Sequence, residues 1–198
     1  MFWDKVYGDS GQVWGDKPSE LAVAAASYLR KQKLDEQPLA VLDIGCGYGR
    51  DALYLAANLR CAVLGVDASE KAIEIATRAV PREHKERVKF QKCNFVELDH
   101  EKYDIVFASH LYHLLKDDER KRLRRIMGRM LKPDGLLFLS TLSVKDPEHY
   151  GKGDPVPGEA NSFHDKTYLH FCTKEELIGD FDFLYMKEIY EHEFYESR

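Results

Sequence analysis

The strongest constraint on the fold is a strand, a glycine-rich turn and a helix that follow one another within residues 39–59. The run "LAVLD" (39–43) is apolar until its last residue, and "CAVLGVD" (61–67) repeats that pattern. Short apolar runs of this kind are typical of strands buried on both faces of a parallel sheet. Parallel strands need a crossover connection, so we expect "RDALYLAANL" (50–59) to be the helix between them.

Helices and strands continue to alternate beyond this unit. A helix capped by Ser69 is expected to run to about Ala79, before Pro81. Apolar residues three and four apart predict another helix at 117–132, which "KPDG" ends. The other expected elements are helices that begin at Pro18 and after Thr173, and strands at 87–91, 103–109, 135–143 and 183–195. This order predicts an α/β fold, a doubly wound, Rossmann-like sandwich whose mostly parallel central sheet has helices on both faces.

The glycine-rich turn carries the first indication of a ligand. Gly45, Gly47 and Gly49 permit positive φ angles and a close approach to the backbone. The dinucleotide-binding fingerprint has its third glycine one position later, and Asp43 would repel a pyrophosphate in a site of low dielectric. A carboxylate at this position suits a cation, such as an α-ammonium or a sulfonium group.

A second acid follows the neighbouring strand. Adjacent strands lie about 4.8 Å apart, so Asp43 and Asp67 are expected at one crevice. The Asp67 carboxylate can accept two hydrogen bonds from a ribose diol. A ligand with an amino acid at one end and a ribose at the other is S-adenosylmethionine. In the alternative, both acids only cap strands and helices, and the glycines form an ordinary turn.

Five segments, in order, resemble the motifs of class I S-adenosylmethionine-dependent methyltransferases: "VLDIGCGYGRDALYLA", "VLGVDAS", "VKFQKCNF", "YDIVFASHLYHLL" and "LKPDGLLFLSTLS". The resemblance covers about residues 38–142. It implies that Asp43 and the glycine loop hold the methionine part of the cofactor, and that Asp67 holds its ribose. The residues it assigns to cofactor binding are Asp43, Gly45, Cys46, Gly47, Asp67, Ala68, Asn94, Phe95 and Ser109.

Two later motifs imply more specific contacts. Asn94 stands where many members of the family carry an aspartate near the adenine amino group, and Phe95 is expected to flank the adenine ring. Ser109 and His110 follow the fourth strand, where the family places backbone groups near the transferable methyl. This fold normally ends with a seventh, antiparallel strand. The tail supplies one strand after residue 182, so either it divides differently or the chain is truncated.

The segment before the first helix resembles the N-terminal cover of small-molecule methyltransferases of the tellurite-resistance and thiopurine kinds. Trp3, Tyr7 and Trp14 are large apolar groups within a polar lead segment, so we expect them to fold back over a pocket. Trp14 is expected to reach the cofactor. Anchoring to the core is the alternative role for all three rings.

Histidines and tyrosines supply the candidates for the acceptor side of the site. His110, His113 and His164 are candidate general bases, although packed or solvent-facing histidines are the simpler interpretation. Tyr112, His113 and Tyr168 are expected to shape the substrate pocket. We expect no metal site, because no carboxylate or thiolate spacing supports one around these histidines or His170.

Charge and composition exclude several partners. The net charge of −5 and the pI near 5.9 disfavour nucleic acid, and no apolar window reaches membrane-spanning length. A basic stripe on the helix at 117–132 could bind nucleic acid, but acids at its start and bases near its end also complement the helix dipole, which we favour. Scattered cysteines without a CxxC pair, and the absence of a signal peptide, predict reduced thiols in the cytoplasm.

These features predict a single methyltransferase domain over residues 1–198. Its expected parts are a cover with a helix, a cofactor-binding core, a lid or substrate loop without a clear period, and a final helix and strand, at residues 1–35, 38–142, 143–172 and 173–198. The expected reaction is in-line methyl transfer to a small molecule by a monomer or homodimer. A regulatory module that binds S-adenosylmethionine without turnover and a nicotinamide-dependent oxidoreductase are the alternatives.

Overall fold

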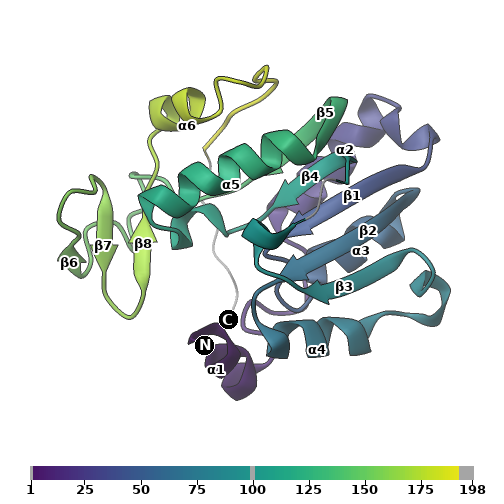
Figure 1. The fold of residues 1–198 in the computed structure, drawn as a ribbon, viewed down its shortest axis with the longest axis horizontal. Coiled ribbons are helices and arrows are strands. Elements are labelled where there is room, and N and C mark those ends of the chain that lie inside the picture. Colours follow the sequence, from purple (N-terminus) through teal and green to yellow (C-terminus); the bar gives the residue numbers. More distant parts are fainter. Residues whose placement is uncertain (1, 99–100, 192–198) are drawn as a thin grey trace.

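A parallel five-stranded sheet forms the centre of the computed structural model, which describes residues 2–98 and 101–191 (Figure 1). The strands lie in the order β3-β2-β1-β4-β5, and every neighbouring pair is parallel. Their bounds are β1 Leu39–Ile44, β2 Cys61–Asp67, β3 Val88–Lys92, β4 Tyr103–Ala108 and β5 Leu131–Leu139. The predicted α/β fold with a doubly wound, Rossmann-like sheet is confirmed.

Helices cover both faces of this sheet. Helices α2 (Glu20–Lys31) and α3 (Arg50–Asn58) share one apolar cluster with Val41 and Val63. Helix α5 (Asp117–Met130) packs on the opposite face, as Figure 1 shows. Because successive residues of a strand point to opposite faces, each buried strand must be apolar throughout. Helix α4 (Glu70–Ala79) follows β2, and Ser69 caps it by accepting from the backbone N–H of Ala72.

The apolar stripe expected on α5 is buried, with Leu123 and Met127 fully enclosed. Its basic residues do not form one free surface. Arg120 is buried and donates to Leu115 O and to Tyr168 Oη, while Arg124 pairs with Asp180. These contacts indicate that Arg120 and Arg124 bind other residues of the domain.

Several expected element bounds are wrong, and β5 ends at Leu139 rather than at residue 143. Helix α2 begins at Glu20 rather than at Pro18, because Ser19 is its cap: the Ser19 hydroxyl accepts from the backbone N–H of Ala22. Helix α5 ends at Met130, and β5 begins directly at Leu131, so "KPDG" lies inside the strand. Asp134 has a φ of 61° there, and the register with β4 shifts. The turn residues therefore bulge the strand rather than precede it.

The expected lid has regular structure of its own. Strands β6 (Asp154–Pro155), β7 (Ser162–His164) and β8 (Tyr168–His170) form a small antiparallel sheet, set apart from the main sheet in Figure 1. The ring centroids of Tyr150 and Phe171 are 5.4 Å apart, and this contact stabilises the small sheet. Strands of two or three residues are too short to show a period of two, so the sequence could not reveal them.

The expected strand at 183–195 is absent from the residues described up to 191, and its remainder lies outside them. Helix α6 (Lys174–Asp180) forms as expected, with the Thr173 hydroxyl accepting from the backbone N–H of Glu176. After α6 the chain exposes Tyr185 and Tyr190. A strand added to the sheet would bury alternate side chains, which this segment does not do.

The lead segment contains a helix that the sequence analysis did not identify, α1 (Phe2–Ser10), which lies beside α4 (Figure 1). The carboxylate of Asp4 accepts a hydrogen bond of 2.8 Å from the Ser69 hydroxyl. This bond fixes α1 near the start of α4, next to the carboxyl end of β2. Across the described ranges, 2–98 and 101–191, every helix is too short or too polar to cross a bilayer.

Candidate active site

The candidate site lies where the order of the strands reverses. Strand β1 has β2 on one side and β4 on the other, and α/β sheets bind ligands at the carboxyl ends of strands at such a point. A cavity opens there. All ten residues expected to bind cofactor line it: Trp14, Asp43, Gly45, Cys46, Gly47, Asp67, Ala68, Asn94, Phe95 and Ser109.

The glycine loop joins β1 to α3 with backbone angles that other residues rarely adopt. Gly45, Gly47 and Gly49 have φ values of 75°, 53° and 82°. The backbone N–H groups of Gly45 and Cys46 both donate to Val66 O, at 2.8 and 3.0 Å, so β2 holds the loop. A Cβ atom on Gly49 would lie 2.5 Å from the Phe90 ring. Glycine is therefore required, and the loop presents bare backbone to the cavity.

Asp43, at the end of β1, is a buried acid with an unused acceptor. Its side chain is 2% exposed, and Oδ2 has no hydrogen-bond partner among the described residues. Burial, followed by the negative charges of Asp51 and Asp67, raises the pKa of Asp43 well above its usual value. A buried carboxylate without a partner is costly, so this position favours a cationic ligand.

Asp67, at the end of β2, lies two residues beyond Gly65, the partner of Asp43 in the sheet. Its Oδ2 accepts from the backbone N–H of Gly47 at 2.9 Å, and its Oδ1 accepts from that of Ser69 at 2.8 Å. Burial raises the pKa of Asp67, and these bonds partly offset that effect. Each oxygen keeps a second lone pair, so the carboxylate can still accept from a diol.

Asn94 and Phe95 lie at the expected adenine end. Asn94 caps the short helix η3 (Phe95–Glu97), and its Oδ1 accepts from the backbone N–H of Val96 at 3.2 Å. A second lone pair of that oxygen is available to a ligand's amino group. Both residues line the cavity. Their position fits the expected adenine contact.

The lead segment closes over the glycine loop and is tied to it. Tyr48 donates to Gly15 O at 2.7 Å and accepts from the Trp14 N–H at 3.1 Å, while Arg50 donates to Trp14 O at 2.7 Å. Tyr7 is buried, and its hydroxyl would be 2.9 Å from a Cβ on Gly47. Core anchoring therefore holds for Tyr7, whereas Trp14 is 45% exposed and is tied to the loop through its backbone. Nothing in the sequence distinguished Tyr48 and Arg50, which make these ties.

Two histidines that follow β4 also line the cavity. His110 and His113 line it, and their ring centroids are 5.8 Å apart. His113 is 6% exposed, and its Nδ1 has no hydrogen-bond partner among the described residues. Burial, and then the nearby His110, His170 and His149, lower its pKa well below the usual value, so His113 is neutral at physiological pH. A neutral imidazole can donate or accept one hydrogen bond at each ring nitrogen, according to its tautomer.

His149 also lines the cavity and was not among the expected residues. Its Nδ1 lies 3.3 Å from Oδ1 of Asp146, a spacing that orients the ring. The Asp146 carboxylate accepts from the backbone N–H groups of Glu148 and His149, at 2.8 and 2.7 Å. The sequence "DPEH" lies in the stretch without a clear period, so no local signal directed it to the site.

Three expected residues lie elsewhere, which corrects their assignment. Tyr112 is buried, donates to Asp180 and accepts from Arg124, so it joins α5 to α6. Tyr168 is buried too and donates to Glu159, within the contact between α5 and the small sheet. His164 is exposed on β7. None of the three lines the cavity, so we withdraw Tyr112 and Tyr168 as substrate contacts and His164 as a base.

Comparisons with known proteins agree with this geometry. Residues 41–135 match the family model described as "Methyltransferase domain". The ribosomal protein L11 methyltransferase of Dictyoglomus turgidum is 32% identical over 132 residues, which are 67% of this chain and 42% of that protein. The 27-O-demethylrifamycin SV methyltransferase of Amycolatopsis mediterranei is 35% identical over 145 residues, 69% of this chain and 52% of that protein.

Solved structures extend the likeness of the fold. The 1,6-didemethyltoxoflavin-N1-methyltransferase of Burkholderia thailandensis was solved with 1,6-didemethyltoxoflavin and S-adenosylhomocysteine. It superposes with a TM-score of 0.65 at 24% identity, over 90% of this chain and 72% of that one. This chain spans about half the length of the curated relatives it matches. With its sheet order and its glycine loop between two acids, the chain carries a methyltransferase domain of the class I, S-adenosylmethionine-dependent family.

Proposed function

We propose that this protein binds S-adenosylmethionine and transfers its methyl group to a small-molecule acceptor. The observation that carries the proposal is the pair of acids at the switch point. Asp43 has a buried, unpartnered oxygen beside a loop of bare backbone, and Asp67 has free lone pairs on the next strand. Together they suit a ligand with a cationic amino-acid end and a ribose.

The chain's own residues would bind, orient and shield the reactants. When bound, S-adenosylmethionine supplies a methyl group activated by a positively charged sulfur. Asp43 and the glycine loop would hold the methionine end, Asp67 the ribose, and Asn94 and Phe95 the adenine. Tyr7 and Trp14 would exclude water from above the loop. Holding the acceptor in line for displacement can supply several kcal/mol, about 7–11 in well-oriented systems, without a covalent step.

A small acceptor is favoured by the cover over the glycine loop. The Tyr48 and Arg50 ties hold the lead segment there. The rifamycin and toxoflavin relatives are named for small-molecule substrates, whereas the L11 relative is named for a protein substrate. We infer a single domain over the described residues. We place it in the cytoplasm, because the thiols of Cys46, Cys61 and Cys172 are buried and scattered along the chain. A monomer or homodimer is the oligomeric state we propose.

The test is transfer of a labelled methyl group from S-adenosylmethionine to a pool of small metabolites, with mass identification of the product. We expect at least one labelled small molecule and no labelled nucleic acid. A label found only in protein would transfer the proposal to protein substrates. Cofactor binding without turnover across the panel would favour the regulatory module.

We expect His113→Gln to lower kcat about 3- to 10-fold while the affinity for S-adenosylmethionine stays unchanged. The neutral His113 ring lines the cavity with a free Nδ1, so it would orient the acceptor through one hydrogen bond, which is worth about 0.5–1.5 kcal/mol. Steady-state kinetics with the identified acceptor measure the change.

The matched control is His164→Gln. His164 is the exposed residue at the end of β7, so this variant should leave kcat unchanged. A role as general base gives a different pattern, because it predicts a loss of about 100-fold or more with a changed pH profile. Equal kcat in His113→Gln and wild type would contradict any role of this ring in the acceptor site.

A further inference from the structure

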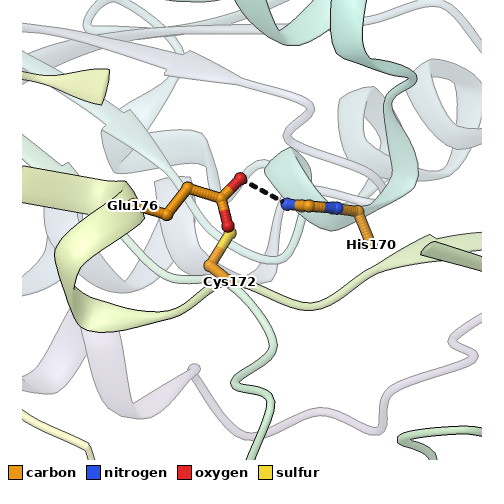
Figure 2. Close-up of side chains that lie close together, drawn as sticks. All are labelled: His170, Cys172 and Glu176. Atoms are coloured by element: carbon orange, nitrogen blue, oxygen red, sulfur yellow. Dashed lines mark hydrogen bonds and ion pairs between the residues drawn. The ribbon is translucent and has the colours of Figure 1, made fainter. Parts of the chain in front are cut away.

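A group of three metal-type side chains, of which His170 and Cys172 are buried, lies outside the residues assigned to the cofactor. His170 ends β8, Cys172 follows it by two positions, and Glu176 lies in the first turn of α6. One ligand atom of each lies within 4.8 Å of those of the other two. Figure 2 shows the Glu176 carboxylate between the imidazole and the thiol. His170 and Cys172 are each 2% exposed.

The backbone positions of this group are fixed by hydrogen bonds. The N–H of Cys172 donates to Leu142 O at 2.9 Å, and its carbonyl accepts from the Val144 N–H at 3.1 Å. The N–H of Glu176 donates to the Thr173 hydroxyl at 3.0 Å, so the first turn of α6 sets the direction of its side chain. A ligand set built on fixed backbone needs little ordering when an ion binds.

The hydrogen-bond network holds both ring nitrogens of His170. Tyr168 must donate to the Glu159 carboxylate, at 2.6 Å, because a carboxylate only accepts. The Ser162 hydroxyl lies within reach of Tyr168 Oη and Ala160 O, at 3.1 and 3.2 Å. Ser162 Oγ also lies 2.9 Å from Nδ1 of His170, and the hydroxyl can donate to that nitrogen or accept from it, according to the tautomer of the ring.

Nε2 of His170 faces Glu176. The contact from Nε2 to Oε1 is 2.7 Å and requires a shared proton in the absence of a cation. Metal-bound histidines usually donate their other ring N–H to an oxygen, and Ser162 Oγ lies 2.9 Å from Nδ1, within reach of such a bond. The ring is thus held in the orientation that a metal ion requires at Nε2.

We infer that His170, Cys172 and Glu176 form a binding site for Zn²⁺ or a similar divalent ion. Nitrogen, thiolate and carboxylate are the donors that Zn²⁺ takes, and three protein ligands leave a fourth position for water. The ion would replace the proton between His170 and Glu176, which would pass to Nδ1 of His170 or to solvent, and the thiol proton of Cys172 would pass to solvent. One thiolate, one carboxylate and one neutral imidazole balance the charge of the ion, so the buried site is neutral.

Metal binding at this group exchanges protons for the ion, because a thiol must lose its proton to become a ligand. The sulfur of Cys172 lies 3.8 Å from the hydroxyl oxygen of Thr141. Binding should therefore release protons and weaken as the pH falls.

The test titrates chelator-treated full-length protein with Co²⁺ alone and records its absorption spectrum. We expect one equivalent to bind, with a thiolate-to-cobalt charge-transfer band that Zn²⁺ abolishes by displacement. Cys172→Ser should lose the band, while Cys61→Ser, at another buried thiol, should keep it. Glu176→Gln should weaken binding about 10-fold or more, and Glu175→Gln, at the exposed neighbour, should not.

Three results would overturn the inference: no stoichiometric binding to the wild type, a band retained in Cys172→Ser, or equal loss of affinity in Glu175→Gln and Glu176→Gln. If Cys172→Ser does not fold, the wild-type titration and the glutamate pair still decide. Wild-type protein should also melt at a higher temperature with Zn²⁺ than with chelator. The inference does not rest on methyl transfer, so it can fail while S-adenosylmethionine still binds.

Discussion

Replacing Asp67 by alanine should weaken the binding of S-adenosylmethionine by about 100-fold or more. The carboxylate is expected to accept two hydrogen bonds from the ribose, and hydrogen bonds to charged groups are worth about 1.5–3 kcal/mol each. Asp67 also holds the glycine loop through the backbone N–H of Gly47. Its loss removes ligand contacts and loosens the loop at the same time. Isothermal titration calorimetry measures the change.

Two variants separate these contributions. Asp182→Ala removes an exposed carboxylate beyond α6 and should bind S-adenosylmethionine as the wild type does. Asp67→Asn keeps one acceptor oxygen and should lose affinity with a smaller change in melting temperature than Asp67→Ala. Wild-type affinity in Asp67→Ala would contradict the ribose contact. Because an acid after the second strand also serves nicotinamide cofactors, a fluorescence titration with reduced nicotinamide cofactor should show no binding.

Asp43→Asn should abolish binding of S-adenosylmethionine while it stabilises the unliganded protein. The amide removes the negative charge that attracts the ammonium and sulfonium groups of the ligand. It also removes a buried charge that Asp51 and Asp67 repel. We expect the free energy of unfolding to rise by about 1–2 kcal/mol, or about 2–8 °C in melting temperature for a chain of this size. Calorimetry and thermal melts measure the two effects.

The pH dependence of stability follows from the raised pKa of Asp43. An unfolded aspartate titrates near about 3.9. Because its folded pKa is higher, Asp43 contributes stability that is fully present below that pH and is lost as the pH rises through the folded pKa. The advantage of Asp43→Asn in melting temperature should therefore grow from acid to neutral pH. Asp182→Asn should show no such trend.

Affinity for the cofactor should have the opposite trend with pH. Only the ionised form of Asp43 attracts a cation, so wild-type affinity should fall as the pH falls through the raised folded pKa of Asp43. If Asp43→Asn destabilises the protein at neutral pH and still binds the cofactor, the Asp43 carboxylate stabilises the glycine loop and does not bind the ligand. The cationic end of the ligand would then be held elsewhere.

The acids of the site could be predicted because short-range features determine their positions. Asp43 and Asp67 end two apolar strands joined by one crossover helix, and parallel pairing then brings them to the same edge. The positive φ angles of Gly45, Gly47 and Gly49 follow from the turn after the first of these strands. The ten residues expected to bind cofactor line one cavity because nearly all follow the ends of adjacent parallel strands.

The acceptor side could not be predicted because distant partners determine it. Tyr112 appeared suited to a pocket, but it bonds to Asp180, 68 residues later. His149 lies in the cavity through the fold of a segment whose strands have two or three residues. The same small sheet brings His170 to Cys172 and Glu176, which the sequence analysis did not connect. Spacing within the sequence describes local geometry and does not reveal such contacts.

The structure of the protein bound to S-adenosylmethionine tests the central claim most directly. We expect both ribose hydroxyls within about 2.5–3.0 Å of the Asp67 carboxylate, and the amino-acid end of the ligand against the Gly45–Gly49 loop beside Asp43. A ligand bound away from β1 and β2, or a ribose held by other residues while Asp67 stays on Gly47 and Ser69 alone, would contradict it.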